Sequence, residues 1–192
     1  LNIKSLYAFY KNIKVQRGNI SMLGVILLYV AIVLISNGIA RVCKIDSKSQ
    51  SIMNLFTGGL SVICNVIVIV FGEISGSTSE FYAAATGLLF GFTYLYIALN
   101  GIFNLDQRLY GWYSLFVAVN SIPAGILCFL DGGFFNISMA IIWWLWGVLW
   151  LTGWIETVAK KNLGKFVGYL SVFEGIVTAW IPGFMIIAGW WH

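Results

Sequence analysis

Six long apolar stretches, separated by short polar connections, make up most of this chain. They cover residues 23–40, 53–71, 82–100, 112–130, 138–158 and 167–189. Each is close to the roughly 20 residues that a helix needs to cross a bilayer. The connections are marked by charged residues, Gly or Asn and leave no room for a soluble domain. The pattern predicts an all-α integral membrane protein, with a six-helix bundle over residues 22–192.

Composition supports this interpretation. The 192 residues are 60% hydrophobic and 9% charged, which is more apolar surface than a soluble domain of this size can bury. The net charge of +4 could suit nucleic acid, but the cations stand in short clusters between apolar runs. We therefore expect membrane lipid as a partner and no nucleic acid.

The distribution of charge predicts the orientation of the bundle. The first, third and fifth connections carry seven Lys and Arg residues, whereas the second and fourth carry only acidic charges. Cytoplasmic connections are enriched in Lys and Arg. The odd connections should therefore face the cytoplasm, and both termini should face outward.

Residues 1–21 do not fit this orientation, because Lys4, Lys11, Lys14 and Arg17 would lie on the outer side. The segment is too polar to span a membrane and lacks the apolar core of a signal peptide. We expect that Met22 is the true start and that the preceding stretch is not native. The alternative is an amphipathic segment on the outer surface.

A faint internal repeat runs through the bundle. Asn37 follows the first span and Asn100 the third, in similar sequences 63 residues apart. Phe56, Phe116 and Phe173 recur at intervals of 60 and 57 residues. These similarities predict three hairpin repeats packed around a pseudo-threefold axis.

The fifth span contains an unusual run of tryptophans, "IIWWLWGVLWLTGWIE". Trp143, Trp146, Trp150 and Trp154 fall on one helix face, while Trp144 points elsewhere. Membrane helix interfaces favour small residues, so a line of indoles suits the wall of a narrow pathway better than a helix contact. A bulky helix contact is the alternative.

Other membrane-depth residues extend this hypothesis. In the third span Phe92 and Tyr96 share a face at i, i+4, although ordinary packing explains them equally well. Glu174 lies inside the sixth span, where an ionisable group usually lines a cavity or finds a partner. Glu156 lies nearer the cytoplasm, and an ion pair with Lys160 at i+4 is expected for it.

The sequence shows no phosphate loop, no nucleophile with a base and no pair of histidines. His192 is the single histidine, and the three cysteines have no metal-ligand spacing. We therefore expect a protein that transports a solute, with no enzymatic activity, no cofactor and no metal.

Several segments resemble the bacterial urea and short-chain amide channels (the AmiS/UreI family), more closely the urea branch. They include "MLGVILLYVAIVLISNGI" (22–39), "GLLFGFTYLYIALN" (87–100), "WYSLFVAVNSIPA" (112–124), "WGVLWLT" (146–152) and "EGIVTAWIP" (174–182). The resemblance implies a hexameric ring of six-helix protomers, each with its own pore, in the bacterial inner membrane. It also implies urea as the solute and a cytoplasmic urease as its consumer, with which the channel could associate.

The same resemblance implies a set of pathway residues by matching positions. These are Leu34, Phe92, Tyr96, Trp143, Trp146, Leu149, Trp150 and Glu174.

Acid-gated members of the family carry long, histidine-rich outer loops, and the short outer connections here contain no histidine. A switch near pH 6 normally uses histidine, so we expect a channel without strong acid gating. The alternatives are a short-chain amide channel, a proton-coupled transporter that uses Glu174, and a scaffold for urease that transports nothing.

Overall fold

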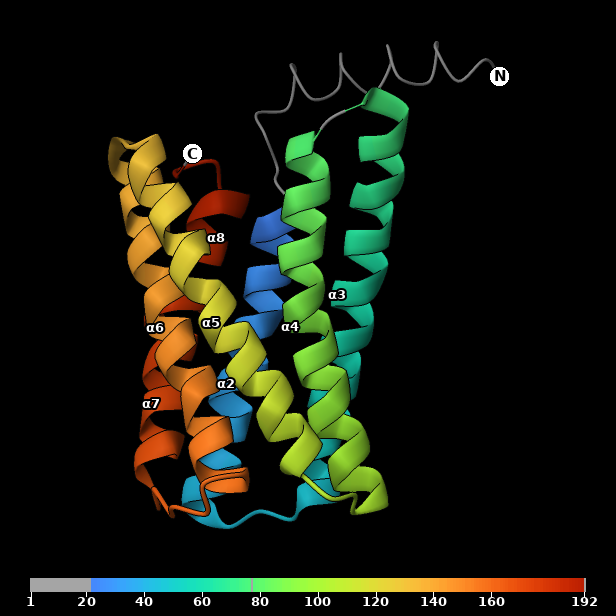
Figure 1. Cartoon of the computed structure of the whole chain (residues 1–192), viewed down its shortest axis with the longest axis vertical. Helices are drawn as coiled ribbons and strands as arrows, with labels where there is room; N and C mark the ends of the chain where they lie inside the picture. Colours follow the sequence, from blue (N-terminus) through green and yellow to red (C-terminus); the bar gives the residue numbers. More distant parts are fainter. Residues whose placement is uncertain (1–21, 77, 192) are drawn as a thin grey trace.

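The structure, a computed structural model, describes residues 22–76 and 78–191. The expectation about residues 1–21 therefore lies outside the described residues. Five single helices come first: α2 (Met22–Cys43), α3 (Ser47–Ser75), α4 (Thr78–Phe103), α5 (Arg108–Asp131) and α6 (Gly133–Thr157). The last span consists of α7 (Phe166–Glu174), the π-helical turn η1 (Gly175–Trp180) and α8 (Ile181–Ile187) (Figure 1).

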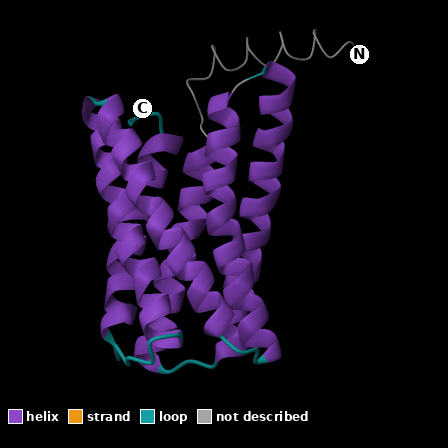
Figure 2. Cartoon of the chain, viewed as in Figure 1, coloured by secondary structure: helices purple, strands orange, loops and turns teal. Residues whose placement is uncertain are grey.

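All six spans are long and apolar enough to cross a membrane. Each predicted span coincides with one helical segment, and most helices extend beyond the predicted ends. The described residues contain no strand (Figure 2). The prediction of an all-α, six-helix membrane bundle is thus confirmed, and the protein is a multi-pass membrane protein.

The helices associate in three tight pairs. Helix α3 packs along α4, α5 packs along α6, and α2 packs along the composite last span of α7, η1 and α8. In Figure 1 the α3–α4 pair and the α5–α6 pair stand on opposite sides of the bundle, with α2 between them. Three helix pairs therefore exist, and they join the second span with the third, the fourth with the fifth and the first with the last.

Small residues allow each pair to approach closely. In the α5–α6 pair, a Cβ at Gly147 would lie 2.1 Å from the Ser121 hydroxyl. In the α2–α7 pair, a Cβ at Gly38 would lie 2.4 Å from the carbonyl oxygen of Gly168. Because lipid is as apolar as the side chains, close backbone packing and interhelical hydrogen bonds replace the hydrophobic effect as the force between helices.

The three inner connections share one backbone geometry. Lys44, Asn104 and Lys160 follow the helix ends with positive φ angles of 56°, 52° and 56°. Two residues after each of these positions, a side-chain oxygen accepts a hydrogen bond from the backbone N–H of the residue that lies two positions further along the chain. The acceptors are Asp46, Asp106 and Asn162, with distances of 3.1, 2.9 and 2.8 Å.

These turns fix the register of the repeat. Lys44 and Asn104 are 60 residues apart, so the counterpart of Asn37 is Ile97, not Asn100. The predicted interval of 63 residues was therefore wrong by one helical turn. The intervals of 60 and 57 residues in the other three spans are consistent with the structure, where Phe56, Phe116 and Phe173 all lie on the outer surface.

The two ends of the bundle differ in charge. The described residues contain seven Lys and Arg, and all of them lie at or beside the three inner turns. The start of α2 and the C-terminal end lie at the opposite end of the bundle (Figure 1). We call the basic end the inner end and the other the outer end.

Candidate functional site

A cavity of about 420 Å³ opens at the inner end and runs into the bundle. Its wall begins at the inner turns, with Lys44 and Ile45, and reaches Phe90 and Trp146 near mid-membrane. Helices α2, α4 and α6 supply most of the lining, and α3, α5 and α7 contribute only near the inner end.

The repeat register explains this arrangement. Equivalent positions of α2, α4 and α6 face the cavity together, in successive layers along its length. From the closed end towards the inner end, the layers are Phe90 with Trp146; Leu34, Tyr94 and Trp150; Asn37, Ile97 and Gly153; and Arg41, Gly101 and Thr157. The pathway is thus apolar and aromatic in depth and polar at its inner opening.

The closed end is an aromatic cluster that we call the neck, formed by Phe90, Trp143, Trp146 and Trp150. The Phe90 ring centroid lies 5.7, 4.7 and 4.8 Å from those of Trp143, Trp146 and Trp150. The contacts with Trp146 and Trp150 are edge-on, which is a favourable geometry for aromatic rings. The neck therefore presents rigid ring faces and edges to any solute.

Two indole N–H groups of the neck already have partners. Trp146 Nε1 donates to Thr178 Oγ1 at 2.8 Å, and Trp150 Nε1 donates to Thr93 Oγ1 at 3.2 Å. Each threonine hydroxyl in turn donates to a carbonyl oxygen of its own helix, that of Glu174 or Leu89. These bonds fix the indole orientations, so the two rings offer mainly their π-faces to the pathway.

The structure brings five of the predicted pathway residues together. Leu34, Trp146, Leu149 and Trp150 line the cavity, and Trp143 continues the aromatic cluster beyond its closed end. The predicted tryptophan stripe therefore exists over its first three members. Trp154 leaves the stripe and packs edge-on against Trp112 of α5, with centroids 6.2 Å apart.

The other two aromatic predictions do not fit the structure. Phe92 is 46% exposed on the outer surface of α4, and Tyr96 stacks on Tyr113 of α5 with centroids 6.0 Å apart. Neither lines the cavity. Phe90 and Tyr94, two residues earlier in each case, occupy the cavity face with the same i, i+4 spacing.

Glu174 is fully buried at the end of α7, where the helix changes to the π-helical turn. Neither carboxyl oxygen has a hydrogen-bond partner among the described residues. Its carbonyl oxygen accepts the Thr178 hydroxyl at 2.6 Å, which connects its backbone to Trp146. Glu174 thus lies behind the neck and does not line the described cavity. Single π-turns often occur at functional sites.

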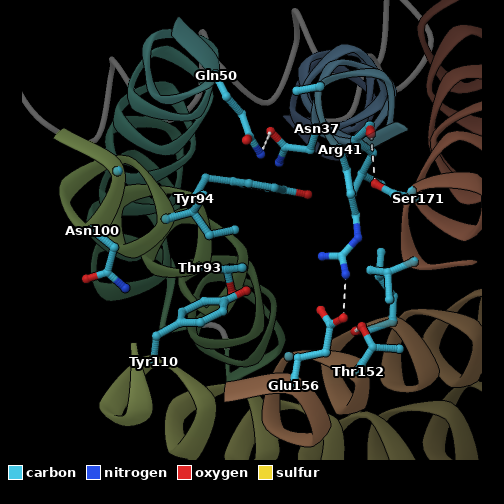
Figure 3. A pocket seen from close by; sticks show the side chains of 18 of the residues that line it. Asn37, Arg41, Gln50, Thr93, Tyr94, Asn100, Tyr110, Thr152, Glu156 and Ser171 are labelled. Carbon is cyan, nitrogen blue, oxygen red and sulfur yellow. Dashed lines mark hydrogen bonds and ion pairs between the residues drawn. The ribbon is translucent and has the colours of Figure 1, made fainter. Parts of the chain in front are cut away.

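The inner opening of the cavity, which we call the mouth, carries an amide network. Asn37 of α2 and Asn54 of α3 exchange two hydrogen bonds of 3.0 and 2.6 Å. Gln50 Nε2 donates to Asn37 Oδ1 at 3.0 Å, as Figure 3 shows. The three amides hold α2 and α3 together, and Asn37 and Gln50 give the mouth a polar wall.

An ion pair crosses the mouth from α2 to α6. The Arg41 guanidinium extends to the Glu156 carboxylate, and their side chains are 34% and 19% exposed (Figure 3). Glu156 was expected to pair with Lys160 at i+4, but α6 ends at Thr157 and Lys160 lies in the following turn, so the structure corrects this. The reason is that α2 extends far enough beyond Asn37 to carry Arg41 across the opening.

The connection between α6 and α7 holds this pair in place. Arg41 Nε donates to the carbonyl oxygen of Gly164 at 2.8 Å, and the Leu163 N–H donates to Glu156 Oε1 at 3.1 Å. The pair, Phe90, Tyr94 and Gln50 were missed from the sequence. Phe90 and Tyr94 could have been found from the sequence, because they have the same i, i+4 spacing as the predicted Phe92 and Tyr96.

The described residues bring no three His, Cys, Asp or Glu side chains close enough together to hold a metal ion. What the site offers is a path from a polar mouth to an aromatic neck inside a multi-pass membrane bundle. Such an arrangement is typical of proteins that pass small polar solutes.

Comparison with known proteins gives the family. A profile of the AmiS/UreI family of transporters matches residues 22–190, and this chain belongs to that family.

Individual relatives agree. The acid-activated urea channel of Helicobacter pylori (strain ATCC 700392 / 26695) is 50% identical over 194 residues, which cover 88% of this chain and all of the relative. A putative amidate substrates transporter protein of Mycolicibacterium smegmatis is 35% identical over 170 residues, or 88% of this chain and 78% of the relative. The crystal structure of the urea channel from H. pylori superposes with a TM-score of 0.81 at 52% identity, covering 88% of this chain and 99% of that structure.

Proposed function

We propose that this protein is an inner-membrane channel that carries urea into the cytoplasm by facilitated diffusion. The observation that carries the proposal is the continuous path from the amide-lined mouth to the aromatic neck. The urea channel relative at 50% identity supports it. The basic inner end then faces the cytoplasm, and the outer end, where α2 starts and the C-terminal end lies, faces the periplasm.

The geometry suits a flat, neutral solute. Urea is planar, so its faces can slide along the ring faces that Phe90, Trp146 and Trp150 present to the pathway. An ion would lose its hydration shell at the neck without a charged ring to replace it. Weak contacts with ring faces also favour fast release, because a strong site would hold the solute.

The test is urea permeability of the purified protein in liposomes, measured by stopped-flow light scattering. We expect permeability well above that of protein-free liposomes, with little uptake of Na⁺ or K⁺. A urea permeability equal to that of protein-free liposomes would contradict the proposal. It would favour the alternative of a urease scaffold that transports nothing.

A short-chain amide channel is the second candidate, because an amidate transporter is 35% identical to this chain. Acetamide permeability measured in the same liposomes separates the two. We expect urea to permeate faster than acetamide.

The unpartnered carboxyl of Glu174 favours a third candidate, a proton-coupled transporter. That mechanism requires a pH gradient to drive urea uphill and requires Glu174→Gln to abolish the coupling. We expect no uphill transport in either protein, and passive permeability of Glu174→Gln within about threefold of wild type.

We further propose that the channel lacks strong acid gating. Helix α3 ends at Ser75 and α4 begins at Thr78, and only Gly132 separates α5 from α6. The H. pylori alignment spans 194 residues, whereas 88% of this chain is about 169 residues. About 25 positions of the acid-activated relative thus have no counterpart here. Urea permeability should change less than about twofold between pH 7 and pH 5, and a steep rise would contradict this.

The assembly we propose is a homo-hexamer that supplies a cytoplasmic urease. Exposed aromatic residues on α3, α5 and α7, such as Phe56, Phe116 and Phe173, give protomers and lipid a broad apolar contact surface. Native mass spectrometry in mild detergent should give six protomers. In whole cells, deletion of the channel should lower urease-dependent ammonia release at low external urea and should leave urease activity in lysates unchanged.

A further inference from the structure

The Arg41–Glu156 pair has hydrogen-bonding groups that no other described residue uses. Glu156 Oε1 accepts from both Arg41 and the Leu163 N–H, while Oε2 has no described partner. On Arg41, Nε and Nη2 are engaged and Nη1 has no described partner. A guanidinium carries five N–H donors and a carboxylate about four acceptor positions, so the pair retains donors and acceptors.

Gln50 adds a third group at the same mouth. Its Nε2 is committed to Asn37, and its Oε1 has no described partner. Gln50, Arg41 and Glu156 all line the cavity, and they come from α3, α2 and α6. Figure 3 shows all three around the same opening. The mouth therefore combines one free donor group with two free acceptor oxygens.

The pair also interrupts the repeat. The residues equivalent to Arg41 in α4 and α6 are Gly101 and Thr157, neither of which carries a charge. A purely structural brace of the inner end would gain from repetition in the other two equivalent helices. A charge pair present once, on the route of the solute, fits a binding role better.

We propose that Arg41, Glu156 and Gln50 form a second solute site at the mouth, separate from the aromatic neck, for small neutral amides rich in N–H groups. The Arg41 donors take the carbonyl oxygen of the solute, and the Glu156 and Gln50 oxygens take its N–H groups. Urea has four N–H bonds and acetamide has two, so the site favours urea. This inference rests on the proposed function and adds a specificity element to it.

The experiment compares urea and acetamide permeability in liposomes for wild type, the double variant Arg41→Gln/Glu156→Gln, and Gln50→Leu. The double variant keeps the mouth neutral and leaves no charge unpaired. We expect its urea permeability to fall about 3- to 10-fold, the effect of losing one or two hydrogen bonds, and its acetamide permeability to fall less than twofold. Gln50→Leu should lower the urea-to-acetamide ratio about twofold.

The matched control is Arg108→Gln, which breaks an exposed ion pair with Asp106 at the same end but outside the cavity lining. It should leave both permeabilities unchanged. An equal fall for both solutes in the double variant would show that the pair only braces the mouth, and an unchanged ratio in both variants would also overturn the site. Wild-type protein without urea permeability would instead overturn the proposed function itself.

Discussion

The neck, formed by α4 and α6, and the mouth, formed by α2, α3 and α6, hold their shape by different means. In the neck, Trp146 and Trp150 are fixed by ring packing and by threonine hydroxyls of η1 and α4. In the mouth, Arg41 and Glu156 are fixed by each other and by the backbone of a connection. The neck is thus a rigid aromatic constriction, whereas the mouth is a polar surface exposed to water.

This difference follows from depth in the membrane. At mid-bilayer an unpaired polar group is costly, which explains why the Trp146 and Trp150 indoles each donate to a threonine hydroxyl. At the inner end, water can replace a missing partner, so residual donors and acceptors are tolerated there. The same repeat register therefore gives an aromatic layer in depth and a polar layer at the opening.

The largest expected effect comes from widening the neck. Trp150→Ala removes the ring that packs on Phe90 at 4.8 Å and should admit solutes larger than urea. We expect the permeability ratio of N,N′-dimethylurea to urea to rise about tenfold or more in liposomes, since aperture width sets selectivity. Trp154→Phe is the control, because Trp154 packs outside the pathway, and it should leave the ratio unchanged. An unchanged ratio in Trp150→Ala would mean that the neck does not select by size.

How well the neck could be predicted shows the limits of periodicity. Trp143, Trp146 and Trp150 were found because a run of indoles has only one helical face with that spacing. In "FGFTYLY", however, two faces carry an aromatic pair at i, i+4. Both lipid and the neck are apolar, so hydrophobicity could not distinguish the face of Phe90 and Tyr94 from that of Phe92 and Tyr96.

The mouth was harder to predict for a different reason. The sequence places Glu156 four residues before Lys160, and within one helix that pair is the natural expectation. The actual partner, Arg41, is 115 residues away in the chain, and it reaches Glu156 only because α2 packs along α7. The six spans and their orientation depend on local composition, whereas contacts between helices depend on register. The sequence repeat predicted the register between α2 and α4 with an error of one helical turn, because it matched Asn37 to Asn100 where the structure matches it to Ile97.

A smaller effect is expected from leaving one charge of the mouth unpaired. Glu156→Gln keeps the size of the side chain but leaves Arg41 without its carboxylate. Because both side chains are partly exposed, we expect a loss of only about 1 kcal/mol in the free energy of unfolding. The double variant Arg41→Gln/Glu156→Gln should lose less than Glu156→Gln does. Thermal unfolding in detergent measures both, and a greater loss in the double variant would contradict the ion-pair interpretation.

The smallest expected effect tests the inner turns that carry the mouth, through their dependence on pH. Hydrogen bonds from the Arg108 side chain and backbone lower the pKa of Asp106 to about 2. Backbone N–H groups of Ser49 and Lys48 likewise lower the pKa of Asp46. A carboxylate whose pKa is lower in the folded protein stabilises it above its unfolded pKa near 4, and this stabilisation is lost as pH falls towards 2. These turns should therefore be unchanged between pH 7 and pH 5.

The repeat supplies a matched control for this prediction, since Asn162 makes the equivalent hydrogen bond but cannot titrate. Asp106→Ala should lower the Tm by a few degrees at pH 7, and this difference should shrink as pH falls from 4 towards 2. Asn162→Ala should give a small loss that does not depend on pH. If the Asp106→Ala difference were the same at pH 7 and pH 2.5, the carboxylate would not be the stabilising group. With Asp46 and Asp106 charged throughout pH 5–7, these two carboxylates cannot act as an acid switch at the inner end.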